Sequence, residues 1–131
     1  MSMPTVGLSV LYADDEEQVR EMMAKMLRWK GLVVHTAADG GEAWNLFRIH
    51  KPDIIVTDIR MPVMDGIEMS RKVREFCPST TIIVASAFLH EQHMADFDSI
   101  GIHSYIQKPI ELEKLLSSIE TGWEKMVNAK H

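Results

Sequence analysis

Cysteine is nearly absent from this sequence, because Cys77 is the only one among 131 residues. A single cysteine cannot form a disulfide within the chain, which is typical of proteins that fold in a reducing cytoplasm. We interpret Cys77 as a small, partly buried apolar residue beside Pro78. A chain of this length buries roughly two-thirds of its surface and folds without a disulfide or a structural metal. The sequence therefore predicts a cytoplasmic protein.

Long apolar runs and an excess of basic residues are also missing. The longest apolar runs have only a few residues, whereas a membrane-spanning helix needs about 20. Residues 1–6 lack the basic start and the apolar core of a signal peptide. Nucleic-acid binding needs clustered Lys and Arg, and here 19 acidic residues outnumber 14 basic ones, for a net charge of −5. We expect neither membrane association nor direct nucleic-acid binding.

Apolar runs of strand length alternate with longer segments of helical period. We predict strands at 6–13, 32–37, 53–58, 81–86 and 104–107, and helices at 16–29, 39–50, 67–76, 90–99 and 111–127. Five strand–helix units in strict alternation predict a parallel sheet with helices on both faces. We expect one α/β domain over residues 1–131, with a core at about 6–127. Its fold would be flavodoxin-like: a doubly wound, five-stranded (βα)5 sheet of order 2-1-3-4-5.

The first and last helices show the clearest apolar faces. Gly31 stands where a left-handed residue would end the first helix, and Asp39 is placed to cap the second. The methionines are interpreted as core filler rather than as a binding groove. The expected core-facing residues are Val19, Met22, Met23, Met26, Leu27 and Trp29 in the first helix, and Leu112, Leu115, Leu116, Ile119, Trp123 and Met126 in the last. Trp44 is expected to pack between helices.

Charged residues stand where the predicted strands end. Asp14 and Asp15 follow the first strand and Asp58 ends the third. In this fold, ligands bind beyond the carboxyl ends of the strands, between strands 1 and 3. Three carboxylates that meet there require either protonation or a divalent cation. Oxygen ligands in a small, partly hydrated site favour Mg²⁺, with Mn²⁺ as the alternative.

The same edge of the sheet carries the parts of a phosphoryl-transfer site. A carboxylate can accept a phosphoryl group and form an acyl phosphate. The transfer needs a metal, a cation on the phosphoryl oxygens and in-line placement. Asp58 lies at the centre of such a set, with Ser86 ending the fourth strand and Lys108 following the fifth. One acid alone would be interpreted as a strand-end or capping residue, but the convergent set predicts a phosphoryl acceptor.

At this point the chain resembles a response-regulator receiver domain of bacterial two-component systems, of the chemotaxis-regulator type. The resemblance covers residues 8–127, and its motifs occur in the order of that family. They are Tyr12-Ala-Asp-Asp-Glu-Glu17, Asp53-Ile-Ile-Val-Thr-Asp58, Met61-Pro-Val-Met-Asp-Gly66, Ser86-Ala87 and Tyr105-Ile-Gln-Lys-Pro109.

The resemblance implies a role for each matched residue in metal and phosphoryl binding. Asp15 and Asp58 would ligate Mg²⁺ directly, Asp14 would hold it mainly through water, and the main-chain carbonyl of Arg60 would add an oxygen. Lys108 would bind Asp58 at rest and the phosphoryl oxygens afterwards.

Further implications concern the switch. A cis peptide at Pro109 would aim Lys108. Ser86 would donate its hydroxyl to the phosphoryl group, and Tyr105 would turn inward when Ser86 moves. The helix at 90–99, the strand of Tyr105 and the last helix would form the partner-binding face.

Two less ordinary residues stand at the mouth of the expected site. Arg60 follows Asp58 by two positions, and Phe88 follows Ser86 by two. We hypothesise that Phe88 shields the phosphoryl group and that Arg60 adds charge, which would give slow self-hydrolysis. The alternative is that both are exposed loop residues without effect.

The resemblance also suggests partners. The phosphoryl donor would be a histidine kinase or a histidine phosphotransfer protein, recognised by residues beside the first helix such as Val19, Met22 and Met23. The output partner or domain is not identified, and either a stand-alone receiver or part of a longer protein is expected. The sequence does not indicate whether phosphorylation drives dimerisation, so both a monomer and a phosphorylation-linked dimer are compatible with it. The protein would not be an enzyme beyond self-catalysed phosphoryl acceptance and slow autodephosphorylation.

Three other classes of protein share part of this pattern. A magnesium-dependent aspartyl-phosphate phosphatase would carry an Asp-x-Asp pair, whereas Ile59-Arg60 follows Asp58. A flavodoxin-like electron carrier would need a Ser/Thr/Gly-rich loop after the first strand. A pseudo-receiver, which binds partners without phosphorylation, usually lacks a key residue, and none is missing here. His90 and His93 lie three residues apart on a predicted helix and could form a metal pair, but no third ligand is evident. A solvated helix face is the preferred interpretation.

Overall fold

A computed structural model describes residues 5–129 of the chain. Strands and helices alternate along the sequence as predicted. The strands are β1 (Ser9–Ala13), β2 (Val33–Ala37), β3 (Ile54–Thr57), β4 (Thr81–Ser86) and β5 (Ser104–Gln107). The helices are α1 (Glu17–Trp29), α2 (Gly40–His50), α3 (Gly66–Phe76), α4 (Glu91–Asp98) and α5 (Leu112–Ala129). Within the described residues, no helix is both long and apolar enough to cross a membrane.

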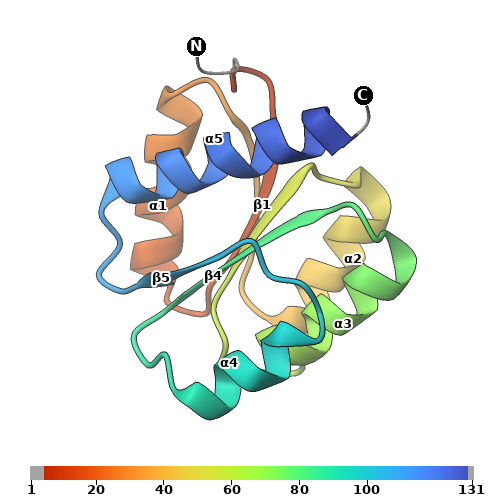
Figure 1. Ribbon diagram of the computed structural model, residues 1–131. Coiled ribbons are helices and arrows are strands. Elements are labelled where there is room, and N and C mark those ends of the chain that lie inside the picture. The colour runs from red at the N-terminus through yellow and green to blue at the C-terminus, as the bar shows by residue number, and fades with distance from the viewer. Residues whose placement is uncertain (1–4, 130–131) are drawn as a thin grey trace.

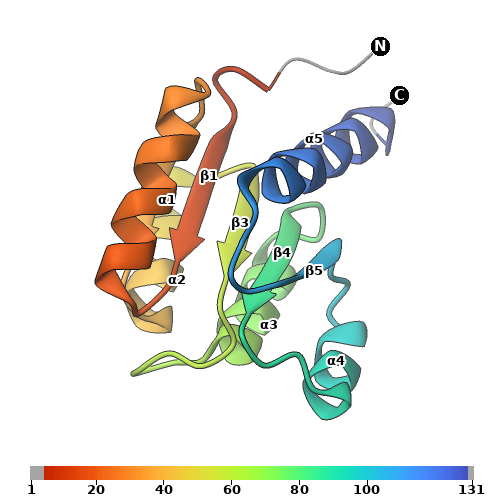
Figure 2. The same ribbon diagram turned by 90° about the vertical axis from the view of Figure 1, so that its left-hand side faces the viewer.

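The five strands form one parallel sheet of order β2-β1-β3-β4-β5. This confirms the predicted flavodoxin-like doubly wound arrangement. In Figure 2, β1, β3 and β4 run side by side with their carboxyl ends at the same edge. Ala13 pairs with Thr57, so the residues that follow β1 and β3 leave the sheet next to each other.

Helices cover both faces of the sheet (Figure 1). α1 and α5 pack on one face, where Leu27 and Ile119 are fully buried. α2, α3 and α4 cover the other face, with Phe47, Val73 and Phe97 in its core. Because both faces are covered, β3 and β4 are buried along their whole length, which explains their almost purely apolar sequences.

Local signals fix where the helices begin and end. The Asp39 side chain accepts a hydrogen bond from the Glu42 amide at 2.8 Å and caps α2, as predicted. Asp65 caps α3 in the same way, through the Glu68 amide. Gly31 has a φ of +92°, the left-handed conformation expected after α1. These short polar and glycine positions set the helix limits because they supply the hydrogen bonds and dihedral angles that helix ends require.

Three predicted positions of apolar residues are wrong. Trp29 and Met22 were placed on the core face of the first helix, but their exposures are 89% and 55%. Val6 was placed in the first strand, which begins only at Ser9, and it is 77% exposed. The apolar stripe of α1 is narrower than the sequence suggested because its buried residues are only Met23, Ala24 and Leu27. Trp44 and Trp123 do pack partly buried against the core, as expected.

Arg74 on α3 ties together two loops at the amino-terminal edge of β4 and β5. Its guanidinium donates hydrogen bonds of 2.7 to 2.8 Å to the carbonyls of Ile100, Pro78, Thr80 and Gly101. A longer contact of 3.5 Å reaches the Cys77 carbonyl. Burial lowers the pKa of Arg74. One side chain thus fastens the α3–β4 and α4–β5 connections to each other.

Val63, in the loop between β3 and α3, has a φ of +70°. The Met64 amide donates to the Pro62 carbonyl at 2.7 Å across it, which closes a three-residue turn. A β-branched residue is strained in this conformation, whereas glycine is not. The Val63 side chain is 85% exposed, so its loss removes little packing.

We therefore expect Val63→Gly to raise the free energy of unfolding by about 1 kcal/mol, the net of relieved strain and lost chain stiffness. Urea denaturation of the two proteins measures this difference. Val33→Gly is the control: Val33 is also exposed but lies in β2 without a positive φ, so glycine should destabilise there. A destabilised Val63→Gly protein would contradict strain at this turn.

Candidate functional site

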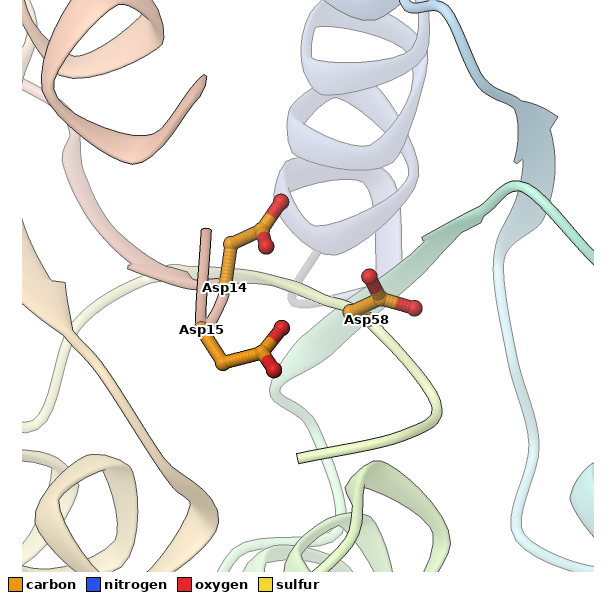
Figure 3. Close-up of side chains that lie close together, drawn as sticks. All are labelled: Asp14, Asp15 and Asp58. Atoms are coloured by element: carbon orange, nitrogen blue, oxygen red, sulfur yellow. The ribbon is translucent and has the colours of Figure 1, made fainter. Parts of the chain in front are cut away.

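Three carboxylates meet at the carboxyl ends of β1 and β3. One oxygen each from Asp14, Asp15 and Asp58 lies within 4.8 Å of the others. Figure 3 shows the three side chains close together, Asp14 and Asp15 after the end of β1 and Asp58 after the end of β3. Asp14 is almost fully buried at 1% exposure, the Asp58 side chain is mostly buried at 12% exposure, and Asp15 is exposed. The cluster thus combines a buried acid, which demands compensation of its charge, with an opening to solvent.

Lys108 compensates two of these charges. Its Nζ donates hydrogen bonds of 2.6 Å to Asp14 Oδ2 and to Asp58 Oδ2. The Lys108 amide donates to the Ser86 carbonyl at 2.9 Å, which holds the end of β5 beside β4. The Lys108–Pro109 peptide is cis, as predicted. The lysine therefore reaches across β4 to the carboxylates because the sheet order places β4 between β3 and β5.

The proton affinities of nearby groups reflect this concentration of charge. Burial alone would lower the pKa of the Lys108 ammonium, but the hydrogen bonds that it donates to Asp14 and Asp58 outweigh burial and raise it. Burial, followed by the charges of Asp14, Asp58 and Glu16, raises the pKa of Tyr12 well above its ordinary value. Lys108 thus stays protonated and Tyr12 neutral at physiological pH.

The backbone around Asp58 leaves little room for movement. The Asp58 amide donates to the Ala13 carbonyl at 3.0 Å, and its Oδ1 accepts from the Ile59 amide at 2.6 Å. The Gly66 amide donates to the Ile59 carbonyl at 2.7 Å. A Cβ at Gly66 would lie 2.0 Å from the Asp58 carbonyl oxygen, so only glycine fits. The start of α3 is thereby packed directly against the backbone of Asp58.

A pocket of about 190 Å³ opens beside Asp58. Hollows of about 530 and 510 Å³ lie elsewhere, along β5–α5 and at the amino-terminal edge of the sheet, but the carboxylate cluster identifies the smaller one as the site. Phe88, 60% exposed, stands at its rim, where it was expected. The lining residues are Asp15, Glu16, Asp58, Ile59, Arg60, Ser86, Ala87, Phe88 and His93.

The two residues assigned to the switch lie on either side of α4. The Ser86 hydroxyl accepts a hydrogen bond from the Phe88 amide at 3.2 Å. The Tyr105 hydroxyl donates to Asp98 Oδ1 at 3.4 Å, and its ring packs edge-to-face on Phe97. Burial and the charge of Asp98 raise the pKa of Tyr105. Tyr105 is thus held toward α4 in this structure, with its hydroxyl group away from Ser86.

The structure brings together the residues that the sequence assigned to the site. Asp14, Asp15, Asp58 and Lys108 form the charged centre, and Arg60 and Ser86 line the adjoining pocket. His93 was interpreted as part of a solvated helix face, and this was wrong because it is partly buried and lines the pocket. In the sequence, the three-residue spacing of His90 and His93 suggests only a possible metal pair. No sequence signal indicates that His93 lies near Asp58.

One expected recognition residue lies elsewhere than predicted. Met23 was named with Val19 and Met22 as a surface contact for a kinase, but Met23 is only 2% exposed and belongs to the core. Val19 is partly buried against the same core, and Met22 is exposed. Of the three, only Met22 presents a large apolar surface to a partner.

The donor set fits a hard divalent cation. Three carboxylates supply oxygen ligands, and the exposed side of Asp15 leaves room for bound water, as Mg²⁺ requires. Lys108 already contributes one positive charge, and three carboxylates exceed it by two. The geometry therefore defines an acidic, metal-competent centre with one carboxylate, Asp58, placed between a lysine and an open pocket.

A parallel (βα)5 sheet with this acidic centre defines the class of receiver-like α/β proteins. The model of the response regulator receiver domain family matches residues 10–120. The chain belongs to this family, whose members serve two-component signalling. The recognition made from the five motifs is thereby confirmed.

Individual relatives agree with the family. The transcriptional regulatory protein PdtaR of Mycobacterium tuberculosis is 35% identical over 114 residues, 85% of this chain and 54% of PdtaR. A CheY-like receiver domain protein from Methanospirillum hungatei has a TM-score of 0.91 at 22% identity, over 94% and 98% of the two chains. Vibrio cholerae chemotaxis protein CheY4 has a TM-score of 0.83 at 30% identity, over 88% and 98%. The chain spans about half or less of the length of the curated relatives it matches.

Proposed function

We propose that this chain accepts a phosphoryl group on Asp58, with Mg²⁺ bound by Asp14, Asp15, Asp58 and the Arg60 main-chain carbonyl. The single observation that carries the proposal is the position of Lys108 Nζ, 2.6 Å from both Asp14 Oδ2 and Asp58 Oδ2. An acceptor needs a cation that can follow charge from the carboxylate to the phosphoryl group. Asp58 has this cation on one side and the open pocket on the other.

The reaction balances without an added base. The bond between phosphorus and the donor atom breaks while a bond forms from phosphorus to an Asp58 carboxylate oxygen. When bound, Mg²⁺ would neutralise the charge that develops on the transferring group. Lys108 then shifts its hydrogen bond to a phosphoryl oxygen, and the Ser86 hydroxyl donates to another. The donor is a histidine kinase or a histidine phosphotransfer protein, consistent with the family.

The switch follows from the change in charge at Asp58. A phosphoryl group has about two negative charges and three strong acceptor oxygens. As Ser86 turns toward it, the hydrogen bond from the Phe88 amide is given up, and Tyr105 leaves Asp98 and turns inward beside α4. The altered surface of α4, β5 and α5 binds the output partner or domain, and a phosphorylation-linked dimer is one form of that output.

The test is intact mass after incubation with acetyl phosphate and Mg²⁺. The parent is expected to gain one phosphoryl mass, and Asp58→Ala is expected to gain none. Asp53→Ala is the matched control, because Asp53 directly precedes β3, at the opposite end of the strand from Asp58, and its carboxylate accepts a hydrogen bond from the Ser9 amide. Chelation of the metal should abolish the gain. A parent that gains no mass would favour a pseudo-receiver, which binds partners without phosphorylation.

Phe88 is expected to slow loss of the phosphoryl group, because its ring stands at the rim of the Asp58 pocket and covers the path of water. Phe88→Ala should shorten the half-life of the phosphorylated protein by about three- to tenfold, which corresponds to about 0.7–1.4 kcal/mol of activation free energy. Mass spectrometry at timed intervals after removal of acetyl phosphate measures it. Phe76→Ala, an equally exposed phenylalanine remote from the pocket, should leave the half-life unchanged.

A self-dephosphorylating receiver differs from an aspartyl-phosphate phosphatase in turnover. The chain has no second aspartate two residues after Asp58, where Arg60 stands. Arg60 instead lines the pocket as a cation. We therefore propose slow, self-catalysed hydrolysis and no activity on external phosphate esters. Steady release of phosphate from such esters, faster than the phosphorylated protein decays, would favour the phosphatase.

A further inference from the structure

His93 lines the pocket beside Asp58 and has a buried nitrogen without a hydrogen-bond partner among the described residues. The side chain belongs to the first turns of α4 and is partly buried. Its Nδ1 is buried and has no hydrogen-bond partner among the residues that the structure describes. The imidazole lines the same pocket of about 190 Å³ as Asp58 and Ser86. A buried polar atom without a partner is costly, and it needs an explanation in the function of the site or in a bound group.

A purely structural explanation does not account for this position. The other buried orphan among the described residues, the Ser70 hydroxyl, is enclosed in α3 and lines none of the pockets. His90 lies 5.7 Å from His93 between ring centroids, but its ring stacks on Phe88 and is exposed. A metal shared by the two histidines has no third ligand, because the only three-residue group found in the described chain is Asp14, Asp15 and Asp58.

The charges around Asp58 identify what the nitrogen would bind. Asp58 Oδ2 is taken by Lys108 and Oδ1 by the Ile59 amide. A phosphoryl group on Asp58 adds three acceptor oxygens. Lys108 binds the phosphoryl oxygen on its own side of Asp58, and oxygens that extend into the pocket meet its lining residues, among them Arg60, Ser86 and His93. Imidazole in either its neutral or its charged form offers an N–H donor to such an oxygen.

We propose that His93 donates a hydrogen bond to the phosphoryl group on Asp58 and so couples phosphorylation directly to helix α4. The inference rests on the proposed function, because it needs a phosphoryl group at Asp58. The inference adds a phosphoryl-binding residue on α4, the helix that is proposed to change position on phosphorylation. The Ser86–Tyr105 pair acts on α4 from the side of β5, whereas His93 acts from the first turns of α4 itself.

This contact stabilises a phosphorylated form in which the start of α4 lies close to Asp58. A contact that exists only in the phosphorylated state shifts the equilibrium of α4 by its full strength. The core holds α4 mainly through Phe97, its only buried side chain among those described. A hydrogen bond at the opposite end of the helix therefore changes its position with little opposition from packing.

The first experiment uses the parent protein and an equilibrium mimic of the phosphoryl group. Beryllofluoride with Mg²⁺ is added to ¹⁵N-labelled protein, and the imidazole nitrogens are followed by NMR. The His93 signals are expected to move as the complex forms, with Nδ1 in a hydrogen-bonded state, and the His90 signals are expected to move much less. His93 signals that stay in place while beryllofluoride binds would overturn the inference.

The second experiment measures the affinity of variants for beryllofluoride by calorimetry. His93→Leu should bind about tenfold more weakly, as expected for the loss of one hydrogen bond to a charged group. His93→Gln retains a donor and should stay within about threefold of the parent. The matched control is His90→Leu, which changes the same residue type on the exposed side and should not alter the affinity. Equal affinities of the parent and His93→Leu would also overturn the inference.

These results are separable from those on the proposed function. One outcome is that the parent gains a phosphoryl mass and binds beryllofluoride while the His93 NMR signals stay in place and His93→Leu keeps the parent's affinity. In that case the inference fails and the proposed function stands. If the parent neither gains mass nor binds beryllofluoride, both fail together. If His93→Leu does not fold, the NMR of the parent decides.

Discussion

Lys108→Met is expected to lower the free energy of unfolding by about 3 kcal/mol in the absence of divalent metal, because removing one partner of a buried ion pair leaves an uncompensated charge. Asp14 is 1% exposed, and its Oδ2 loses the ammonium 2.6 Å away. Asp58 loses the same partner. Urea denaturation in the presence of a chelator measures the effect.

The cause can be separated from lost packing in two ways. Mg²⁺ at millimolar concentration should recover much of the loss in Lys108→Met, because a cation among the same carboxylates takes over the role of the ammonium. Adding Asp14→Asn to Lys108→Met should also recover stability, because it removes the unpaired charge. Lys114→Met is the matched control, since Lys114 pairs with Glu111 in the open at 3.7 Å, and such pairs contribute about 0–1 kcal/mol. Equal losses at both lysines would contradict this account.

The pH dependence of this effect has a definite sign. The folded protein raises the pKa of Lys108 above its ordinary value of 10.5, through the two carboxylates that outweigh burial. A raised pKa means that the lysine stabilises the folded state fully below 10.5 and that this contribution disappears as pH rises through the folded-state pKa. The difference in stability between the parent and Lys108→Met should therefore be constant near neutral pH and shrink as the pH rises into the alkaline range.

Arg74→Met should cost about 2–3 kcal/mol, less than the sum of its hydrogen bonds, because some of the released carbonyls gain water. The guanidinium holds four main-chain carbonyls at 2.7 to 2.8 Å, from the two loops that lead into β4 and β5. Urea denaturation measures the loss, and amide hydrogen exchange should rise at residues 79–80 and 100–101. The helix itself should keep its protection, because Arg74 supports the loops rather than α3.

Two controls test the geometry of Arg74. Arg71→Met removes an exposed arginine from the same helix and should change stability by less than about 0.5 kcal/mol. Arg74→Lys keeps the charge but not the planar fork, so it should restore only a fraction of the loss. If Arg74→Lys were as stable as the parent, charge and not the fan of hydrogen bonds would be the cause.

Much of the fold could be read from local sequence. The limits of β4 and β5 agree with the prediction residue for residue, and the other elements differ by a few residues at their ends. The reason is that buried parallel strands carry almost purely apolar runs, and capping residues such as Asp39 act on neighbours a few positions away. The sheet order also followed, because crossover rules leave few arrangements of five βα units.

The exposure of the apolar residues in α1 could not be predicted from the local sequence, unlike the limits of the strands and helices. Trp29 and Met22 fit a helical apolar stripe, yet they face solvent, while Met23 is enclosed. The stripe of a helix predicts which side faces the sheet but not how far the sheet extends under it. α1 covers β1 and β2 near the edge of the sheet, so the margin of its apolar face remains uncovered.

Which charged residues stand at the strand ends could be predicted from the sequence alone, and with them the acidic centre and its lysine. Ser86 ends a strand, each of the other residues of this set follows one, and a parallel sheet brings such positions to one edge. The set is Asp14, Asp15, Asp58, Ser86 and Lys108. Only the tertiary structure decided which groups face one another there. It placed Lys108 Nζ at equal distances from Asp14 and Asp58 and turned His93 into the pocket beside them. Those facts depend on how β5 and α4 pack against distant parts of the chain, which no local pattern encodes.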